Sequence, residues 1–433
     1  MNIILLSGGS GKRLWPLSND VRSKQFIKVF KTDNGYESMV QRIYRQIKAT
    51  DPEAVVTIAT SRSQVSAITN QLGEDVSISV EPCRRDTFAA IALATAYLHD
   101  VKGVSENEAV VVCPVDPYVE NSYFECVKKL YEEADKGKSN LVLMGIEPSY
   151  PSEKYGYIRP EGKGYIFTEK PNEEMARKYI SQGAMWNGGV FAYKLSYVLD
   201  KAKELLGSSN YTDLFSNYEN LKKISFDYAV VENEKSIEVV KYSGTWKDLG
   251  TWNTLTEAIE ENAIGDATIT ESCSGVHVIN ELGVPILVSG IKDAVVVASP
   301  DGILVSDKGQ SSYIKPYVDQ ISRQVMYAEK TWGSYQVMDV EETSMTVKVT
   351  LNPGHRMNYH SHERRDEVWT VIEGSGKTII DGMEQPVRPG DVITMEAGCK
   401  HTVIAGNEGI QLIEVQLGSE INVNDKKKFE MPF

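Results

Sequence analysis

Cysteine and histidine are scarce in this 433-residue sequence, and long hydrophobic runs are missing from it. The five cysteines are an odd number and none stands in a CxxC pair, so neither a disulfide framework nor a cysteine-based zinc site is expected. No apolar run approaches the roughly 20 residues that span a bilayer. The short apolar start runs directly into a glycine loop and lacks the basic leader of a signal peptide. These absences predict a protein of the reducing cytoplasm.

Positive charge is also in deficit. The sequence has 46 Lys and Arg residues against 60 Asp and Glu residues, which gives a formal net charge of -14. Nucleic acids and anionic membranes are therefore not expected as partners, because either would be approached against long-range repulsion. A phosphate-bearing ligand would have to be held locally, where Lys, Arg and backbone N–H groups gather.

The order of apolar and polar runs predicts three regions. Residues 1–262 alternate short apolar runs with longer amphipathic ones, which predicts a Rossmann-like α/β domain with a mixed, mostly parallel sheet and ligands at the carboxyl ends of its strands. Residues 263–325 carry short β-rich pieces between Gly and Asp residues, and predict a β connector that could form a short β-helix. Residues 326–433 show alternating runs between glycine turns, which predicts a small antiparallel β-barrel.

A glycine-rich loop follows the first predicted strand, in LLSGGSGKRLWPLS (5–18). Glycines let the backbone approach phosphate oxygens closely, and Lys12 and Arg13 add positive charge. The loop by itself is weak evidence, since it matches neither GxGxxG nor a P-loop and is as readily an ordinary turn. Lys24, in the following SKQF, would supply a point charge for a phosphoryl transition state, although a lone lysine is more often a solvated surface residue.

Taken together, GGSGKRLWPLS and KQF resemble the signature of the nucleotidyltransferases that make nucleotide sugars, and RLWPLS with KQF is most similar to the mannose-1-phosphate guanylyltransferases. Further segments keep the order of that family: EPCRRDTFAAIALA (81–94), VVVCPVDPYV (110–119), KYGYIRP (154–160), FTEKP (167–171), MWNGGVFAYK (185–194), SFDYAVVE (225–232) and TWKDLGTW (245–252). The resemblance implies that GTP and mannose-1-phosphate give GDP-mannose and diphosphate, by in-line attack on the α-phosphorus with Mg²⁺.

The resemblance also implies which residues form this site. The catalytic residues would be Arg13, Lys24, Asp116 and Asp248. Both aspartates would hold Mg²⁺ through carboxylate oxygens, although either could instead be a helix cap or a turn residue. The nucleotide would contact Leu6, Ser7, Gly8, Gly9, Ser10, Gly11, Lys12, Glu81, Asp86 and Thr87. The sugar phosphate would contact Gly156, Glu169, Lys170 and Asn187.

Two positions depart from the pattern of the family. Asp86 stands where Asn is usual, and Pro117 stands where His usually follows the metal-binding aspartate. A carboxylate near the base could accept the N1 and N2 hydrogens of guanine, which adenine and uracil cannot offer, whereas cytosine is not cleanly excluded. Asp86 is therefore predicted to support guanine selection.

Four of the six histidines lie near the C-terminus. The segment GHRMNYHSHERRDEVWTVIEG (354–374) matches the first cupin motif, and GDVITMEAGCKH (390–401) matches the second except that Glu396 stands where Pro is usual. Two histidines that are two positions apart on a strand face the same side, so they can converge inside a barrel, whereas a lone strand histidine is more often a polar surface residue. A zinc, iron, manganese or nickel site is therefore predicted. Its expected ligands are His360, His362, Glu367 and His401.

The order of the two parts resembles the bifunctional enzymes that join a mannose-1-phosphate guanylyltransferase to a cupin mannose-6-phosphate isomerase. In that isomerase Gln usually stands at the position of His360. An arginine-bearing segment usually follows the last strand, where this chain has NVNDKKKFEMPF (422–433). Lys426, Lys427 or Lys428 would have to replace that arginine as the cation near the reacting carbonyl. Metal binding is therefore predicted, and isomerase activity stays open.

Two alternatives accompany these predictions. The N-terminal site could use another pair of nucleoside triphosphate and sugar phosphate. The cupin could be a metal-binding sensor or oligomerisation module without catalysis. In either case a homo-oligomer is expected.

Overall fold

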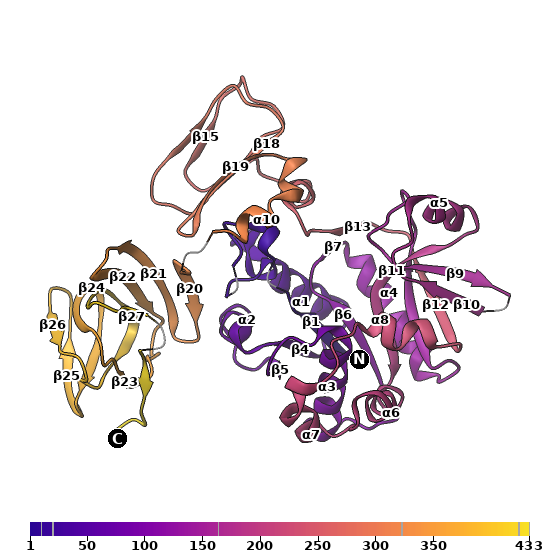
Figure 1. Cartoon of the computed structure of the whole chain (residues 1–433), viewed down its shortest axis with the longest axis horizontal. Helices are drawn as coiled ribbons and strands as arrows, with labels where there is room; N and C mark the ends of the chain where they lie inside the picture. Colours follow the sequence, from indigo (N-terminus) through magenta and orange to yellow (C-terminus); the bar gives the residue numbers. More distant parts are fainter. Residues whose placement is uncertain (10, 20, 163, 322–323, 423–424, 433) are drawn as a thin grey trace. The chain divides into compact units, whose positions relative to one another are not determined.

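The computed structural model describes the chain except for eight residues: Ser10, Asp20, Lys163, Ser322, Arg323, Val423, Asn424 and Phe433 (Figure 1). The backbone forms two compact units. The first comprises Met1–Gly11 and Ser23–Glu260, and the second comprises Lys12–Arg22 and Glu261–Phe433. The predicted boundaries after residues 262 and 325 stay predictions.

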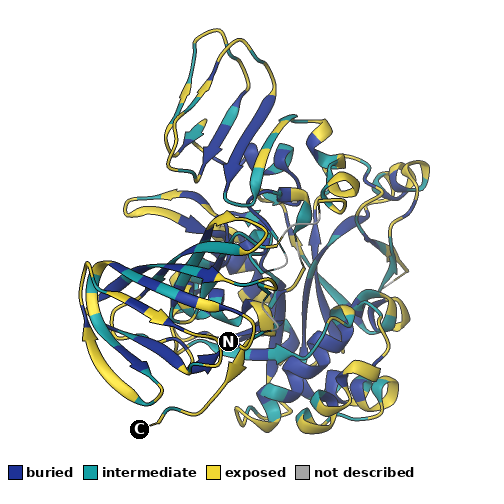
Figure 2. Cartoon of the chain, turned by 60° about the vertical axis from the view of Figure 1, so that its left-hand side comes forward, coloured by how far each residue is buried: buried dark blue, intermediate teal, exposed yellow. Residues whose placement is uncertain are grey.

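A nine-stranded mixed sheet forms the centre of the first unit, in the order β10-β9-β11-β6-β1-β4-β5, with β8 on β11 and β12 on β8. Strands β1, β4, β5 and β6 run parallel, and β11 is antiparallel to β6. The apolar runs of the sequence form these strands, and most of their residues are buried (Figure 2). The strands are β1 (Asn2–Ser7), β4 (Val55–Ser61), β5 (Ser77–Glu81), β6 (Ala109–Pro114), β8 (Leu141–Ile146), β9 (Tyr157–Glu161), β10 (Gly164–Thr168), β11 (Met185–Lys194) and β12 (Ile237–Tyr242).

Helix α3 (Asp86–Asp100) lies in the main core of the first unit, because nearly all of its residues are apolar or small and ten of them are buried. Two short antiparallel pairs lie outside the large sheet: β2 (Lys28–Thr32) with β3 (Gly35–Ser38), and β7 (Pro117–Val119) with β13 (Trp246–Asp248). The other helices are α1 (Met39–Thr50), α2 (Val65–Leu72), α4 (Asn121–Asp135), α5 (Glu173–Ser181), α6 (Leu195–Leu206), α7 (Tyr211–Ser216), α8 (Phe226–Ala229) and α9 (Trp252–Thr256).

Short parallel strands open the C-terminal part of the second unit. Strands β14 (Ala263–Ile264), β16 (His277–Asn280) and β18 (Ala294–Ser299) pair in parallel, as do β15 (Ala267–Ile269) and β17 (Ile286–Val288). This stacking of successive turns is the expected short β-helix. It is closed by the antiparallel β19 (Gly302–Asp307) and followed by α10 (Lys315–Val318).

The segment Lys12–Arg22 is held in the second unit by polar contacts with the β-helix region. Ser299 Oγ donates to the carbonyl of Pro16 over 2.9 Å, and Arg22 Nη1 lies 2.7 Å from Glu281 Oε2. Gly302 has a φ of +148°, and a Cβ added there would lie 2.4 Å from Trp15 Cζ2. A side chain at position 302 would therefore displace the Trp15 ring.

An antiparallel barrel completes the second unit, as the alternating runs predict. Strand β24 differs in one respect from the expectation of short runs between glycine turns. Gly374, with a φ of +73°, does not end the strand but lies within it, at register shifts that mark bulges. The strands are β20 (Tyr327–Lys330), β21 (Gly333–Val340), β22 (Ser344–Leu351), β23 (His360–Ser361), β24 (Asp366–Ile380), β25 (Met383–Val387), β26 (Val392–Met395), β27 (His401–Leu417) and β28 (Lys427–Lys428). In the described part of the chain, no helix has the length and apolar character needed to cross a membrane.

Candidate functional site

The glycine loop begins where β1 ends at the carboxyl edge of the sheet. Its backbone is held from inside by three polar side chains that sequence analysis did not single out. Ser23 Oγ and Gln64 Nε2 donate to the carbonyl of Gly9 over 2.7 and 3.2 Å, and Gln25 Nε2 donates to Ser7 Oγ over 3.1 Å. All three are buried, so the path of the loop is fixed by hydrogen bonds within the first unit.

Close backbone approach explains one glycine of the loop. Gly11 has a φ of +62°, and a Cβ added to it would lie 2.8 Å from Lys24 Cβ and 2.9 Å from Lys24 N. Only glycine allows the two segments to lie this close without strain. Of the other predicted loop residues, Ser7 is buried, Leu6 is half-buried, Gly8 and Gly9 are exposed, and Ser10 lies outside the described residues.

Lys24 lies between two carboxylates. Its Nζ is 2.9 Å from Asp116 Oδ2 and 3.6 Å from Asp248 Oδ1. Asp116 follows β6, and Asp248 reaches the same place because β13 pairs with β7, with Asp248 opposite Pro117. Both carboxylate side chains are close to half exposed. The structure thus brings together three of the four predicted catalytic residues, and leaves oxygen atoms of both aspartates accessible.

The two basic residues of the loop lie in the second unit. Lys12 and Arg13 belong to the 3-10 turn Lys12–Leu14. Lys12 Nζ forms an ion pair with Asp319 Oδ1 over 3.1 Å, within the same unit, and Arg13 is exposed.

The three residues outside the glycine loop that were predicted to contact the nucleotide all have protein partners. At the end of β5, Glu81 accepts a hydrogen bond from the hydroxyl of Tyr218 over 2.7 Å, and its burial raises the pKa of its carboxyl. Asp86 is exposed, has a φ of +68°, and accepts from the N–H of Thr87 over 2.8 Å. The hydroxyl of Thr87 accepts from the N–H of Phe226 over 2.8 Å.

The four residues predicted for the sugar phosphate lie together. Glu169 forms an ion pair with Lys170, whose φ of +44° places a non-glycine residue in the left-handed region. A Cβ added to Gly156 would lie 2.5 Å from Phe167 Cζ and 2.6 Å from Glu169 Oε2, so glycine lets the Phe167 ring and the Glu169 carboxylate lie against the backbone here. The N–H of Asn187 donates to the carbonyl of Gly156 over 2.8 Å.

Asp227 joins this group, although the sequence did not single it out. Its Oδ1 accepts a hydrogen bond from Asn187 Nδ2 over 2.7 Å. Burial and the nearby negative charge of Glu169 raise the pKa of Asp227 to about 6, against the lowering effects of Asn187 and Lys170. The residue stood within SFDYAVVE, but nothing in the spacing indicated where its side chain points.

Aromatic residues come directly before two of these residues in the sequence: Tyr155 precedes Gly156, and Trp186 precedes Asn187. The rings of Trp186 and Trp246 both pack on Tyr155, with ring centroids 5.0 and 5.3 Å apart. A cavity of about 430 Å³ lies beside the two tryptophans, and Glu147 and Lys247 add charged groups to its lining. Apolar faces with a few polar groups are typical of small-ligand sites.

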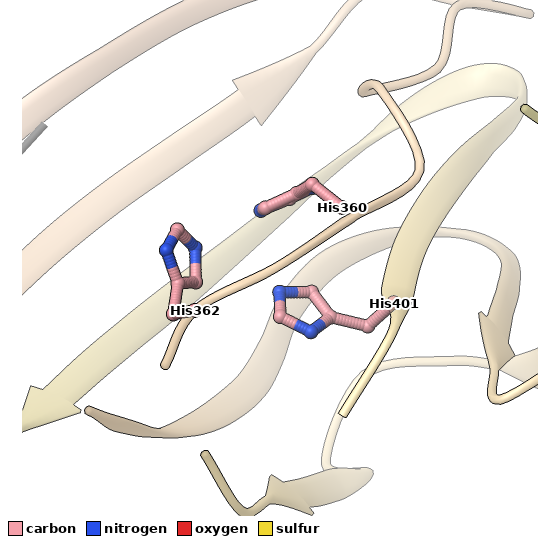
Figure 3. A group of neighbouring side chains, drawn as sticks. All are labelled: His360, His362 and His401. Carbon is pink, nitrogen blue, oxygen red and sulfur yellow. The ribbon is translucent and has the colours of Figure 1, made fainter. Parts of the chain in front are cut away.

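In the barrel of the second unit, His360, His362 and His401 converge from β23, the residue that follows it, and β27 (Figure 3). One ligand nitrogen of each ring lies within 4.8 Å of the others, and all three residues are buried. Each Nδ1 lies 2.6 to 3.0 Å from a backbone carbonyl, so Nδ1 carries the proton and Nε2 is left as the ligand atom. Burial lowers the pKa of His360 to about 2 and that of His362 to about 4, which keeps both rings neutral.

Glu367 completes the cluster, as predicted from spacing. Its Oε1 lies 3.2 Å from His362 Nε2 and its Oε2 lies 3.2 Å from His401 Nε2. Glu367 Oε2 and His401 Nε2 are buried and make no hydrogen bond in the described part of the chain. Unpaired buried polar atoms are costly, and their arrangement here suits a bound metal ion. This cluster of residues can hold a metal.

A buried cation lies beside the cluster. Arg365 donates from Nε to Glu367 Oε1 over 2.9 Å, and its Nη2 is 2.9 Å from His362 Nε2. Arg365 comes two residues before the carboxylate ligand and is not among the predicted residues. The cation was expected among the lysines after the last strand, and the charge of one of them, Lys426, also acts on His360 and Glu367. Of those lysines, Lys427 pairs with Glu363, and both residues are exposed.

Comparison with known proteins identifies two families along the chain. The family model described as Nucleotidyl transferase matches residues 2–263, and the model described as Cupin domain matches residues 347–415. The mannose-1-phosphate guanylyltransferase of Escherichia coli is 28% identical over 98% of this chain and 97% of its own length. The alginate biosynthesis protein AlgA of Pseudomonas aeruginosa is 27% identical over 99% of this chain and 96% of its own.

A solved structure is also similar. It is described as mannose-1-phosphate geranyltransferase from Thermus thermophilus, and it aligns with a TM-score of 0.60 and 27% identity over 74% of this chain and 98% of that chain. The predicted fold class and family resemblance are both confirmed. The nucleotidyltransferase model accounts for more than half of the sequence, and the chain belongs to the nucleotidyl transferase family.

Proposed function

We propose that the chain transfers a guanylyl group from GTP to mannose-1-phosphate, forming GDP-mannose and releasing diphosphate. The observation that carries this proposal is the grouping of Lys24, Asp116 and Asp248 at the carboxyl edge of the sheet. The names of the relatives support the choice of sugar phosphate and nucleotide.

The two aspartates suit Mg²⁺, which prefers oxygen ligands and keeps several waters, because both carboxylates are accessible. Bound there, Mg²⁺ would neutralise charge on the phosphate oxygens. Lys24 would turn its ammonium from the aspartates to the phosphoryl group that is transferred. Because the sugar phosphate itself attacks the α-phosphorus, the protein has only to align the reactants and stabilise charge.

The sugar phosphate would bind at the second group of residues. Glu169 would accept hydrogen bonds from sugar hydroxyls, Lys170 would bind the phosphate, and Asn187 would hold a hydroxyl through its amide. The loop glycines would bring backbone N–H groups to the triphosphate, and Arg13 would add its guanidinium charge.

Guanine selection by Asp86 is part of the proposal. Its carboxylate is exposed and could accept two N–H groups of guanine, although it also caps Thr87 in the free protein. Before substitution GTP should be preferred over CTP, and in Asp86→Ala the two rates should become equal. An unchanged preference would show that Asp86 does not select the base.

For the barrel we propose one divalent transition metal, zinc, iron, manganese or nickel, held by the three histidines and Glu367. Isomerisation of mannose-6-phosphate is the catalytic candidate, and Arg365 favours it because a buried cation beside the metal could stabilise a developing oxyanion. The alternative is a metal-binding module without catalysis. An isomerase assay on the metal-loaded protein, with His362→Ala as the metal-free comparison, separates the two.

The experiment that tests the main proposal is diphosphate release with Mg²⁺, using GTP, CTP, ATP and UTP against mannose-1-phosphate and glucose-1-phosphate. Asp116→Asn is the inactive comparison, and Asp200→Asn, on the exposed side of α6, is the matched control. Release confined to GTP with mannose-1-phosphate supports the proposal. Release with another pair keeps the mechanism and changes the substrates, and no release by any pair refutes it.

The cytoplasmic location and the homo-oligomeric state predicted from the sequence stay predictions. Light scattering on the purified full chain tests the second.

A further inference from the structure

The amide of Asn187 is held at both ends. Its Nδ2 donates to Asp227 Oδ1 over 2.7 Å, and its Oδ1 accepts from the N–H of Gly189 over 3.2 Å. An asparagine amide has one carbonyl and two N–H groups, so these two bonds fix which end points where and leave one N–H for a ligand. Without Asp227 the amide could flip, which would exchange the positions of its oxygen and nitrogen.

Charged groups from a second element face the same carboxylate. Glu169 and Lys170 follow β10, and both act on Asp227 through their charges. Lys170 in turn is influenced by Glu169, Tyr228 and Asp227. Lys170 forms its ion pair with Glu169, and the charge of Asp227 acts on it in addition, so removing either carboxylate changes the charge that meets a phosphate at Lys170.

The short helix that carries Asp227 is itself anchored. Four residues are too few to form a stable helix alone, so α8 depends on tertiary contacts. The N–H of Phe226 donates to Thr87 Oγ1 over 2.8 Å, and the Phe226 ring packs 4.8 Å from Phe191 and 6.3 Å from Phe88. The start of α3 thus fixes the residue immediately before Asp227.

We propose that Asp227 is a positioning residue for the sugar phosphate, which orients the amide of Asn187, and that Thr87 supports it by holding α8 rather than by contacting the nucleotide. This inference rests on the proposed function and deepens it. It predicts that substitutions at both positions weaken the sugar phosphate and spare the nucleotide.

The first experiment measures KM for mannose-1-phosphate and for GTP separately in Asp227→Ala and Asp227→Asn. In Asp227→Ala the KM for mannose-1-phosphate should rise about tenfold, which corresponds to about 1.4 kcal/mol, with the KM for GTP changed less than about twofold. Asp227→Asn keeps an oxygen that can accept from Asn187, so its KM for mannose-1-phosphate should rise less. If Asp227→Ala does not fold, Asp227→Asn still reports the loss of the charge, through a KM for mannose-1-phosphate that rises alone. Asp200→Asn serves as the control for an exposed aspartate.

The second experiment compares Thr87→Val with Thr87→Ser. Valine has the same shape without the acceptor, so the KM for mannose-1-phosphate should rise several-fold, whereas serine keeps the hydroxyl and should restore it. A rise in the KM for GTP instead would overturn the inference and return Thr87 to the nucleotide. Equal rises in both KM values, or no rise in any variant, would also overturn it.

Calorimetric titration of mannose-1-phosphate with Mg²⁺ separates this inference from the proposed function. A wild-type protein that neither turns over nor binds the sugar phosphate overturns both. If the wild-type protein binds the sugar phosphate no more tightly than Asp227→Ala, the role of Asp227 alone is overturned.

Discussion

Replacing Gly11 by alanine tests how closely the loop must approach Lys24. The new Cβ would lie 2.8 Å from Lys24 Cβ and 2.9 Å from Lys24 N. Carbon atoms rest at about 3.5 Å or more, so the Lys24 segment has to move by about 0.7 Å. Alanine at a φ of +62° also lowers the free energy of unfolding by about 1 kcal/mol, because its Cβ crowds the following carbonyl.

The consequence for catalysis follows from the position of Lys24. Its Nζ lies 2.9 Å from Asp116 Oδ2, and a shift of the backbone moves this ammonium relative to the reacting phosphate. A misplacement of about 1 Å can cost about 100-fold in rate, so we expect kcat for diphosphate release to fall about 10-fold to 100-fold.

The matched control is Gly103→Ala. Gly103 has a φ of +70° and nothing within 4 Å of an added Cβ, so it carries the same backbone strain without the clash. Gly103→Ala should lose about 1 kcal/mol in the free energy of unfolding, measured by urea, and Gly11→Ala should lose more because of the clash; only Gly11→Ala should lose activity. If Gly11→Ala kept kcat within about twofold of wild type while folded, the close contact with Lys24 would not matter for the reaction.

Three further predictions concern the carboxylates and the barrel. Asp116→Asn and Asp248→Asn should each lower kcat by about 100-fold or more and raise the Mg²⁺ concentration needed for half-maximal rate, because each removes an oxygen charge from the proposed site; an unchanged Mg²⁺ dependence would argue for a turn or cap role. His362→Ala should lose the barrel metal, measured by elemental analysis, with diphosphate release by the other unit retained; full metal content would exclude His362 as a ligand. A carboxyl whose pKa is raised on folding binds its proton more tightly in the folded state, so wild type loses stability as pH rises from about 4 to about 6 at Asp227. Asp227→Asn lacks this loss and should gain about 2 kcal/mol over wild type at pH 8 relative to pH 4. Equal shifts in melting temperature at pH 4 and pH 8 would show that Asp227 does not titrate as stated.

Local patterns in the sequence predict much of the fold. Apolar runs of strand length alternate with amphipathic ones, and these became β1, β6, α3 and α4. The two-residue spacing of His360 and His362 predicts side chains on one face, because strand periodicity is a local property. The histidines do converge in the barrel.

Long-range register could not be read in the same way. The pairing of β13 with β7 brings Asp248 to Asp116, and it depends on the path of all the chain between them. Arg365 and Asp227 were missed for a related reason. The spacing of a motif does not indicate whether a charged side chain within it points into a site or into water. That orientation is determined only by the packing of the folded chain.

The course of the chain after Gly11 has a consequence for how such proteins can change by recombination. The backbone leaves the first unit after Gly11 and returns to it at Ser23, so a stretch of the N-terminal sequence is part of the second unit. Ser299 holds the carbonyl of Pro16, and Gly302 makes room for the ring of Trp15. Exchange of the C-terminal half for that of a distant relative would therefore have to preserve the groups that receive this stretch, and the two halves are expected to be inherited as a pair rather than as interchangeable parts.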